Sequence, residues 1–168
     1  MFYLDTCVIL AYCIDGDPQH RKAVNLVEKL RQKADKFYAS TLTLVELYSV
    51  LSRNIQKYRL PPGIEESVNH KNKLQATITY FIQLLSLHIL SDEAKLVDLG
   101  NLKLFYEFFD AIDLATKLKL KTLDLLHLAY ARQFAAKKLI RSFVTFDSQI
   151  LENKDAILKD IGIEVTDG

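Results

Sequence analysis

Short runs of apolar residues alternate along the chain with longer stretches in which apolar residues recur every three or four positions. The short runs predict β-strands and the longer stretches predict amphipathic helices. The predicted strands are 2–5, 36–40, 87–90, 142–146 and a last edge strand at 162–165. The predicted helices are 6–14, 18–34, 41–57, 65–85, about 102–118, 123–138 and a short one after Asp147. Strands that alternate with helices predict a three-layer α/β/α sandwich around a central, mainly parallel sheet of four to five strands.

The length of 168 residues predicts one domain over 1–168. The clearest break is Arg-Leu-Pro-Pro-Gly at 59–63, which we interpret as a loop and not as a domain boundary. The stretch of about 59–118 is therefore expected to be a helical elaboration of the domain. In its last part, Phe and Leu residues cover more than one side of the predicted helix, which is typical of a central or interface helix.

Charge and cysteine content limit the classes of protein that fit. The formal net charge is +1, which neither supports nor excludes a nucleic-acid partner. Cys7 and Cys13 cannot form a zinc site or a disulfide framework by themselves, and they favour a reduced protein. The first predicted strand leaves no room for a signal peptide, and no apolar run reaches the roughly 18 residues of a membrane span. A cytoplasmic protein is expected.

Four carboxylates lie at the starts or ends of the predicted elements: Asp5, Glu46, Asp124 and Asp147. Each has a structural explanation when taken alone. Asp5 and Asp147 could cap the helices that follow them, and Glu46 could close a capping box with Thr43. Asp124 could complement a helix dipole.

Taken together, the four carboxylates favour a shared site. Asp5 and Asp147 both follow apolar strands, and the carboxyl ends of parallel strands lie at one edge of a sheet. Glu46 and Asp124 lie early in helices rich in apolar residues, so we expect them to point inward. Such a group repels itself unless cations lie between its members. Oxygen ligands without His or Cys select Mg²⁺ or Mn²⁺, which can activate water and stabilise a phosphoryl transition state.

Four short motifs occur in order along the chain: Tyr-Leu-Asp-Thr at 3–6, Leu-Val-Glu-Leu at 44–47, Leu-Asp-Leu-Leu-His-Leu-Ala at 123–129 and Val-Thr-Phe-Asp at 144–147. In order and approximate spacing, this set resembles the PIN-domain ribonucleases, which include VapC-type toxins. The resemblance covers essentially the whole chain. It implies a parallel sheet, an acidic site for Mg²⁺ or Mn²⁺ and cleavage of single-stranded or structured RNA.

The resemblance also assigns roles to single residues. It implies that Asp5, Glu46, Asp124 and Asp147 are the catalytic and metal-binding residues, and that Thr6 and Thr145 are supporting hydroxyls. It implies a homodimer and, for toxins, a small antitoxin protein. The stretch between Glu46 and Asp124 is longer than in compact toxin members.

Other polar residues have plainer interpretations. His127 lies one turn after Asp124, but no second histidine is placed to bind a metal with it, so we interpret it as a packed or hydrogen-bonded residue. Asp110 and Asp113 are expected to mark the exposed side of their helix. Four cations flank the helix that carries Asp124 and are candidates for RNA contact, although cations are also common at helix ends without a ligand: Lys121, Lys137, Lys138 and Arg141.

The sequence thus predicts a metal-dependent endoribonuclease, acting either as a toxin or as a processing nuclease. A haloacid-dehalogenase-like phosphatase would need a second acid two residues after Asp5, where this chain has Cys7. A response-regulator receiver domain would need paired acids at the first strand end and a lysine after a late strand. A non-catalytic PIN-like module that binds RNA or protein remains the alternative, and metal-dependent RNA cleavage separates it from an enzyme.

Overall fold

The computed structural model describes residues 1–34, 36–58, 60–65 and 69–168. Its centre is a five-stranded sheet in the order β3-β2-β1-β6-β7, in which neighbouring strands are parallel. The strands are β1 (Phe2–Leu4), β2 (Phe37–Ser40), β3 (Leu87–Leu90), β6 (Ser142–Val144) and β7 (Glu164–Thr166). The prediction of a mainly parallel sheet with a last edge strand is confirmed.

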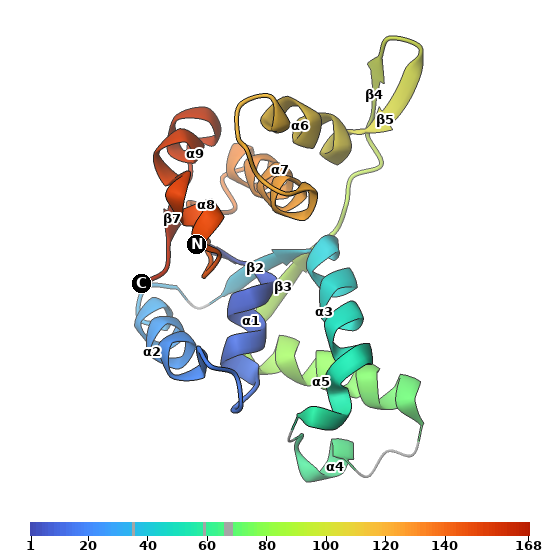
Figure 1. Ribbon diagram of the computed structural model, residues 1–168, viewed down its shortest axis with the longest axis vertical. Helices are drawn as coiled ribbons and strands as arrows, with labels where there is room; N and C mark the ends of the chain where they lie inside the picture. The colour runs from blue at the N-terminus through green and yellow to red at the C-terminus, as the bar shows by residue number, and fades with distance from the viewer. Residues whose placement is uncertain (35, 59, 66–68) are drawn as a thin grey trace.

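Helices cover both faces of this sheet, which gives the predicted three layers (Figure 1). One face packs against α1 (Thr6–Cys13), α2 (His20–Arg31), α3 (Thr41–Asn54) and α5 (His70–Leu84). The other packs against α6 (Tyr106–Ala115), α7 (Thr122–Ala136), α8 (Ser148–Glu152) and α9 (Lys154–Ile161). A short 3-10 turn, η1 (Ile55–Lys57), and a short helix, α4 (Pro62–Glu65), lie between α3 and α5.

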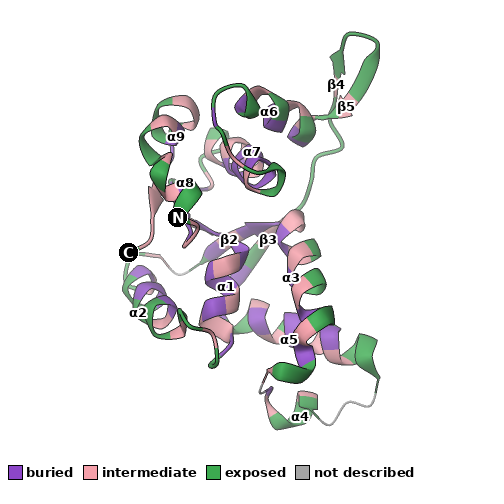
Figure 2. Cartoon of the chain, in the orientation of Figure 1, coloured by how far each residue is buried: buried purple, intermediate pink, exposed green. Residues whose placement is uncertain are grey.

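The central strand β1 has neighbours on both sides and helices above and below it. Its Tyr3 and Leu4 are fully buried and belong to the two opposite cores, because successive strand residues point to opposite faces. Burial on both faces explains why β1 reads as a continuous apolar run and not as an alternating pattern. Figure 2 shows the buried residues concentrated where the helices face the sheet.

The helix predicted over about 102–118 is wrong in its first part. Leu102–Phe105 forms strand β5, which pairs antiparallel with β4 (Leu96–Leu99), and only α6 is helical. Gly100 and Asn101 connect the two strands, and Gly100 has a φ of +60°, which suits a tight hairpin turn. The high apolar content suggested a helix, but the turn between two short runs decides for a hairpin. The stretch 59–118 therefore contains this hairpin and β3 in addition to helices.

Two further expectations change in the structure. The predicted helix 41–57 is rich in apolar residues, but in α3 only some of them are buried: Leu47 and Leu51 are in the core while Val45 is 65% exposed. Asp110 is not on the exposed side of α6 but is buried near Arg132. Residue 59 of the predicted loop and residues 66–68 of the predicted 65–85 helix lie outside the described residues. Within the described ranges, no helix combines the length and the apolar character that a membrane span requires.

Candidate active site

Asp5 lies at the carboxyl end of β1, and the neighbouring strand β6 supplies a partner at the same level. β1 and β6 are paired in parallel up to Leu4 and Val144, and the Asp5 amide donates to the Val144 carbonyl at 3.0 Å. The next residue of the second strand, Thr145, donates its hydroxyl to Asp5 Oδ2 at 2.6 Å. The two strand ends therefore bring this carboxylate and this hydroxyl together.

Glu46 reaches the same region from α3. Its Oε2 atom accepts a hydrogen bond from the Thr6 hydroxyl at 2.5 Å and contacts His127 Nε2 at 2.6 Å. The capping-box explanation does not hold, because α3 begins after Ser40 and Glu46 bonds across the fold instead. Burial raises the pKa of Glu46, but the hydrogen bonds from His127 and Thr6 outweigh it and hold that pKa below its ordinary value.

His127 completes a compact group with these two acids. One ligand atom from each of Asp5, Glu46 and His127 lies within 4.8 Å of the others. The imidazole is only 3% exposed, and its Nδ1 atom lies 2.8 Å from the Tyr3 hydroxyl. Burial opposes its protonation, but Tyr3, Glu46 and Asp5 together outweigh that effect and raise the pKa of His127 to about 10. The sequence identified a hydrogen-bonded histidine but missed that its partner is a site carboxylate.

Asp124 and Asp147 lie outside this compact group but act on the same region. Asp147 caps α8, since its Oδ1 accepts from the backbone amides of Gln149 and Ile150 at 2.7 and 3.2 Å. Asp124 lies in the first turn of α7, and its Oδ2 is buried without a hydrogen-bond partner among the described residues. Burial raises the pKa of Asp124, and the negative charges of Asp147 and Asp5 raise it further.

The carboxylates share a pattern that suits a cation. In Asp5, Glu46 and Asp147, one oxygen accepts hydrogen bonds, and the described residues donate none to the other, although His127 Nε2 lies 4.0 Å from Asp5 Oδ1. Asp124 adds a buried oxygen that lacks any such partner. Hard divalent cations bind such oxygens, and a cation would relieve the repulsion that raises the pKa of Asp124. The donor set therefore fits a hard divalent cation.

Two neighbours of Asp5 in the sequence, Cys7 and Tyr3, also belong to the site, although no prediction above assigns them to it. The Cys7 thiol donates to Asp5 Oδ2 at 3.1 Å, and burial raises its pKa to about 12, so it stays protonated. Tyr3 lies two residues before Asp5 and contacts His127 as well as Ser40. For Tyr3, the spacing of two from Asp5 was the available signal, because residues two apart along an extended strand point to the same face. Cys7 lies in the first turn of α1, where this rule does not apply.

The four cations predicted near the site are separated by the structure. Lys121 directly precedes α7 and is exposed close to Asp124 in the chain. Lys137 and Lys138 follow the far end of the same helix, about 20 Å away at a rise of about 1.5 Å per residue. The Arg141 amide bonds to the Met1 carbonyl, which places it at the amino ends of the strands. The structure therefore places these last three residues away from the acids, and their contact with RNA stays a prediction.

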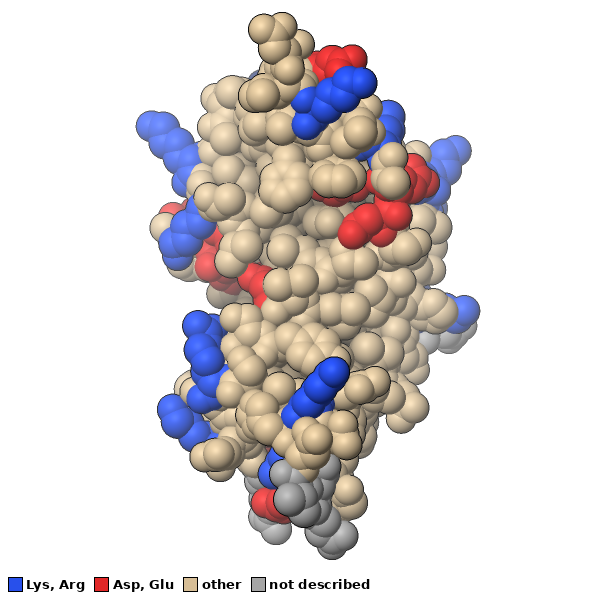
Figure 3. Space-filling model, turned by 90° about the vertical axis from the view of Figure 1, so that its right-hand side faces the viewer, with Lys and Arg blue, Asp and Glu red and all other residues tan. Residues whose placement is uncertain are grey.

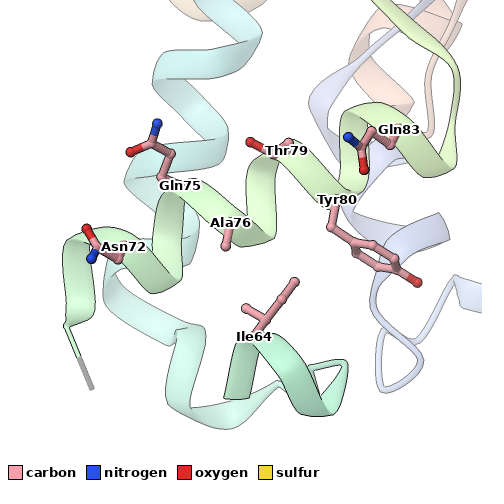
Figure 4. A pocket seen from close by; sticks show the side chains of 7 residues that line it. All are labelled: Ile64, Asn72, Gln75, Ala76, Thr79, Tyr80 and Gln83. Atoms are coloured by element: carbon pink, nitrogen blue, oxygen red, sulfur yellow. The ribbon is translucent and has the colours of Figure 1, made fainter. Parts of the chain in front are cut away.

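A separate pocket lies between α4 and α5 (Figure 4). Ile64 of α4 faces the α5 side chains across it, and Gln75 and Tyr80 are among the residues that line it. Among the described residues that line this pocket there is no carboxylate, histidine, lysine or arginine. The cluster of described residues that could hold a metal lies elsewhere, at the carboxyl edge of the sheet.

Comparison with known proteins agrees with this architecture. The structure is similar to Mycobacterium tuberculosis VapC20, described as a sarcin-ricin loop cleaving toxin, with a TM-score of 0.57, 17% identity and coverage of 90% of this chain and 94% of that one. It is also similar to VapBC2 from Rickettsia felis, solved bound to a promoter DNA fragment, with a TM-score of 0.52, 20% identity and coverage of 99% and 98%. No curated protein sequence matches the chain. The sequence profile of the PIN domain matches residues 2–156, and the chain therefore belongs to the PIN domain family.

Proposed function

We propose that this protein is a metal-dependent endoribonuclease that hydrolyses RNA phosphodiester bonds with Mg²⁺ or Mn²⁺. The observation that carries the proposal is the set of carboxylate oxygens without donors at the carboxyl edge of the sheet, contributed by Asp5, Glu46, Asp124 and Asp147. Membership of the PIN domain family supports the same activity. When bound, the cation supplies activated water and neutralises phosphate charge.

The residues divide the work according to their position. Asp5 and Asp147 follow strands and are held by donors on one oxygen, so they are the proposed direct ligands. Glu46 and Asp124 come from helices and bind through water or accept a proton from it. The raised pKa of Asp124 suits a group that accepts this proton, because a base works best when its pKa approaches the working pH. Thr6 and Thr145 keep Glu46 and Asp5 in place through their hydroxyls.

Lys121 is the proposed contact to the RNA backbone among the four predicted cations. It is exposed and directly precedes the helix that carries Asp124. Lys137 already pairs with Glu93 at 2.6 Å. A single lysine contributes a sequence-independent attraction to phosphate, so we expect it to increase RNA affinity without selecting a sequence.

A toxin role with a small antitoxin partner is the biological setting that we propose, in the cytoplasm. Its support is the likeness to VapC20, which is described as a toxin, and to VapBC2, which was solved bound to a fragment of its promoter DNA. A processing nuclease without an antitoxin is the second setting that we consider, and co-purification of a small protein from the same operon distinguishes the two.

We also propose a homodimer, with the β4–β5 hairpin and α6 as its interface. Six apolar side chains on these elements are at least 40% exposed, and none belongs to either core: Leu96, Leu99, Leu102, Phe105, Phe108 and Ile112. An isolated two-stranded hairpin is marginally stable in water, so a second copy that covers it would stabilise it. Figure 3 looks onto this side and shows a broad area without charged side chains. Asp98 opposite Lys103 leaves the hairpin without net charge, which disfavours RNA as its partner.

The experiment that tests the activity is cleavage of labelled RNA by the purified protein with Mg²⁺, with Mn²⁺ and with chelator. We expect cleavage with either metal and none with chelator. Asp5→Asn should remain folded and abolish cleavage, while Asp155→Asn on the exposed side of α9 serves as the matched control. RNA binding without cleavage in every metal would favour the non-catalytic module. Cleavage that persists in chelator or in Asp5→Asn would exclude the proposed site.

A further inference from the structure

We infer that His127 is a positioning residue, oriented by Tyr3, that directs Glu46 toward the cation and does not itself bind it. The inference rests on the proposed metal-dependent function and deepens it. His127 lies close enough to Asp5 and Glu46 to belong to a three-ligand group. The hydrogen bonds on the two sides of its ring decide between a ligand and a positioning role.

The Nε2 side of the ring faces Glu46 at 2.6 Å. An ionised carboxylate can only accept hydrogen bonds, so the hydrogen of this contact belongs to Nε2. This holds for the neutral imidazole and for the imidazolium. A ring nitrogen that carries a hydrogen has no free electron pair for a metal, so His127 can bind a cation through Nε2 only by losing its bond to Glu46.

The Nδ1 side of the ring is held by a second chain of polar groups. The Tyr3 hydroxyl lies 2.8 Å from Nδ1 and 2.8 Å from the Ser40 hydroxyl. Tyr3 is fully buried in the central strand and stacks on Phe143 with ring centroids 5.1 Å apart. The Tyr3 and His127 rings meet edge to face at 6.0 Å. The imidazole is therefore fixed from both ends in a packed core, and turning it would break both hydrogen bonds.

Fixing the ring has a direct consequence for Glu46. Oε2 of this carboxylate receives the His127 Nε2–H and the Thr6 hydroxyl, which approach from different elements. Two donors on one oxygen fix the orientation of the carboxylate and leave Oε1 for a ligand. Groups that hold a metal-binding side chain through hydrogen bonds typically change metal affinity by about 10–100-fold when they are removed.

The test measures Mg²⁺ and Mn²⁺ binding to the full-length protein by titration calorimetry, without RNA. His127→Leu removes the hydrogen-bond donor to Glu46 and should lower the affinity for both cations by the same factor, about tenfold. The factor is the same because His127 acts on the cation only through Glu46 and therefore has no preference between the two metals. His127→Gln, whose amide can again donate toward Glu46, should recover most of the affinity. Tyr3→Phe should also lower the affinity for both cations equally, but by a smaller factor than His127→Leu. The matched control is Tyr130→Phe, one turn further along α7 and outside this network.

The outcomes separate the inference from the proposed function. A selective loss of Mn²⁺ relative to Mg²⁺ in His127→Leu would show a nitrogen ligand, which a softer cation prefers, and would overturn the inference. Unchanged affinity in His127→Leu and Tyr3→Phe, with normal binding by the parent, would overturn the inference alone. No binding of either cation by the parent would refute both. Thermal melts in chelator confirm that each variant is folded before its affinity is compared.

Discussion

Replacing Asp124 by asparagine should stabilise the metal-free protein and at the same time reduce its response to Mg²⁺ or Mn²⁺. The carboxylate is half-buried, its Oδ2 has no partner among the described residues, and Asp147 and Asp5 repel it. Asparagine has nearly the same shape but removes the charge. If Asp124 had only a structural role, its replacement would not both increase stability and reduce metal binding.

The size of the effect follows from the surroundings of this carboxylate. Asparagine also leaves a polar group at this position, so the gain comes from removing the charge; an unpartnered buried group costs about 1–3 kcal/mol, and more when it is charged. Asp124 is partly exposed and water screens part of the repulsion, so we expect the lower end, about 1 kcal/mol. For a chain of this length, that corresponds to a rise in melting temperature of about 2–4 °C.

The pH dependence of this gain has a definite sign. The pKa of Asp124 is raised in the folded protein, so its ionisation opposes folding. The penalty is absent below the unfolded pKa of about 3.9, grows as the pH rises through the folded pKa and is complete above it. The advantage of Asp124→Asn should therefore be full at neutral pH and vanish as the pH falls toward the unfolded value.

The assay is a set of thermal melts of the parent and the variant in chelator, in Mg²⁺ and in Mn²⁺. Metal should raise the melting temperature of the parent more than that of Asp124→Asn, because a ligand bound only to the folded state stabilises it. Asp147→Ala provides a contrast, since losing the α8 cap should destabilise the metal-free protein by about 1 kcal/mol. If Asp124→Asn melts below the parent in chelator and responds equally to metal, the shared-charge explanation is wrong.

Three further predictions concern neighbouring features. Glu46→Gln should destabilise the metal-free protein at neutral pH but not in acid. The partners of Glu46 lower its pKa, so the stability that the ionised carboxylate contributes is lost as the pH falls through the folded pKa. Urea unfolding at both pH values measures this difference. Leu102→Glu should yield a monomer in sedimentation. Leu158 is also an exposed leucine but lies on α9, so Leu158→Glu should leave the dimer intact. A monomeric parent would contradict the interface. Lys121→Ala should weaken RNA binding in filter assays and Lys138→Ala should not; equal losses would contradict the assignment.

The sequence by itself determined the architecture of the sheet. The mostly apolar runs at 87–90 and 142–146 coincide with β3 and overlap β6. β6 is buried at every position, as expected for a strand covered on both faces. It also placed Asp5 at a strand end, where the neighbouring parallel strand brings Thr145 within reach. These features depend on local spacing and on the geometry of parallel strands, so they can be predicted without tertiary detail.

The spacing of apolar residues did not predict the structure where a helix and a strand fit the same composition. The run at 102–105 is apolar enough for a helix, and only its pairing with 96–99 across the Gly100 turn makes it a strand. Lys137 and Lys138 are close to Asp124 in the sequence but lie beyond the opposite end of α7. The length of α7 separates these two lysines from the acids.

Only the tertiary structure decided how the acids are held. Glu46 and His127 are separated by 81 positions, and Tyr3 and His127 by 124, yet each pair forms a hydrogen bond in the core. No periodicity relates such residues, because their contact depends on how α3 and α7 pack against opposite sides of β1. The sequence supplied the carboxylates, and the packing of these elements determined which oxygens receive donors and which are left for a cation.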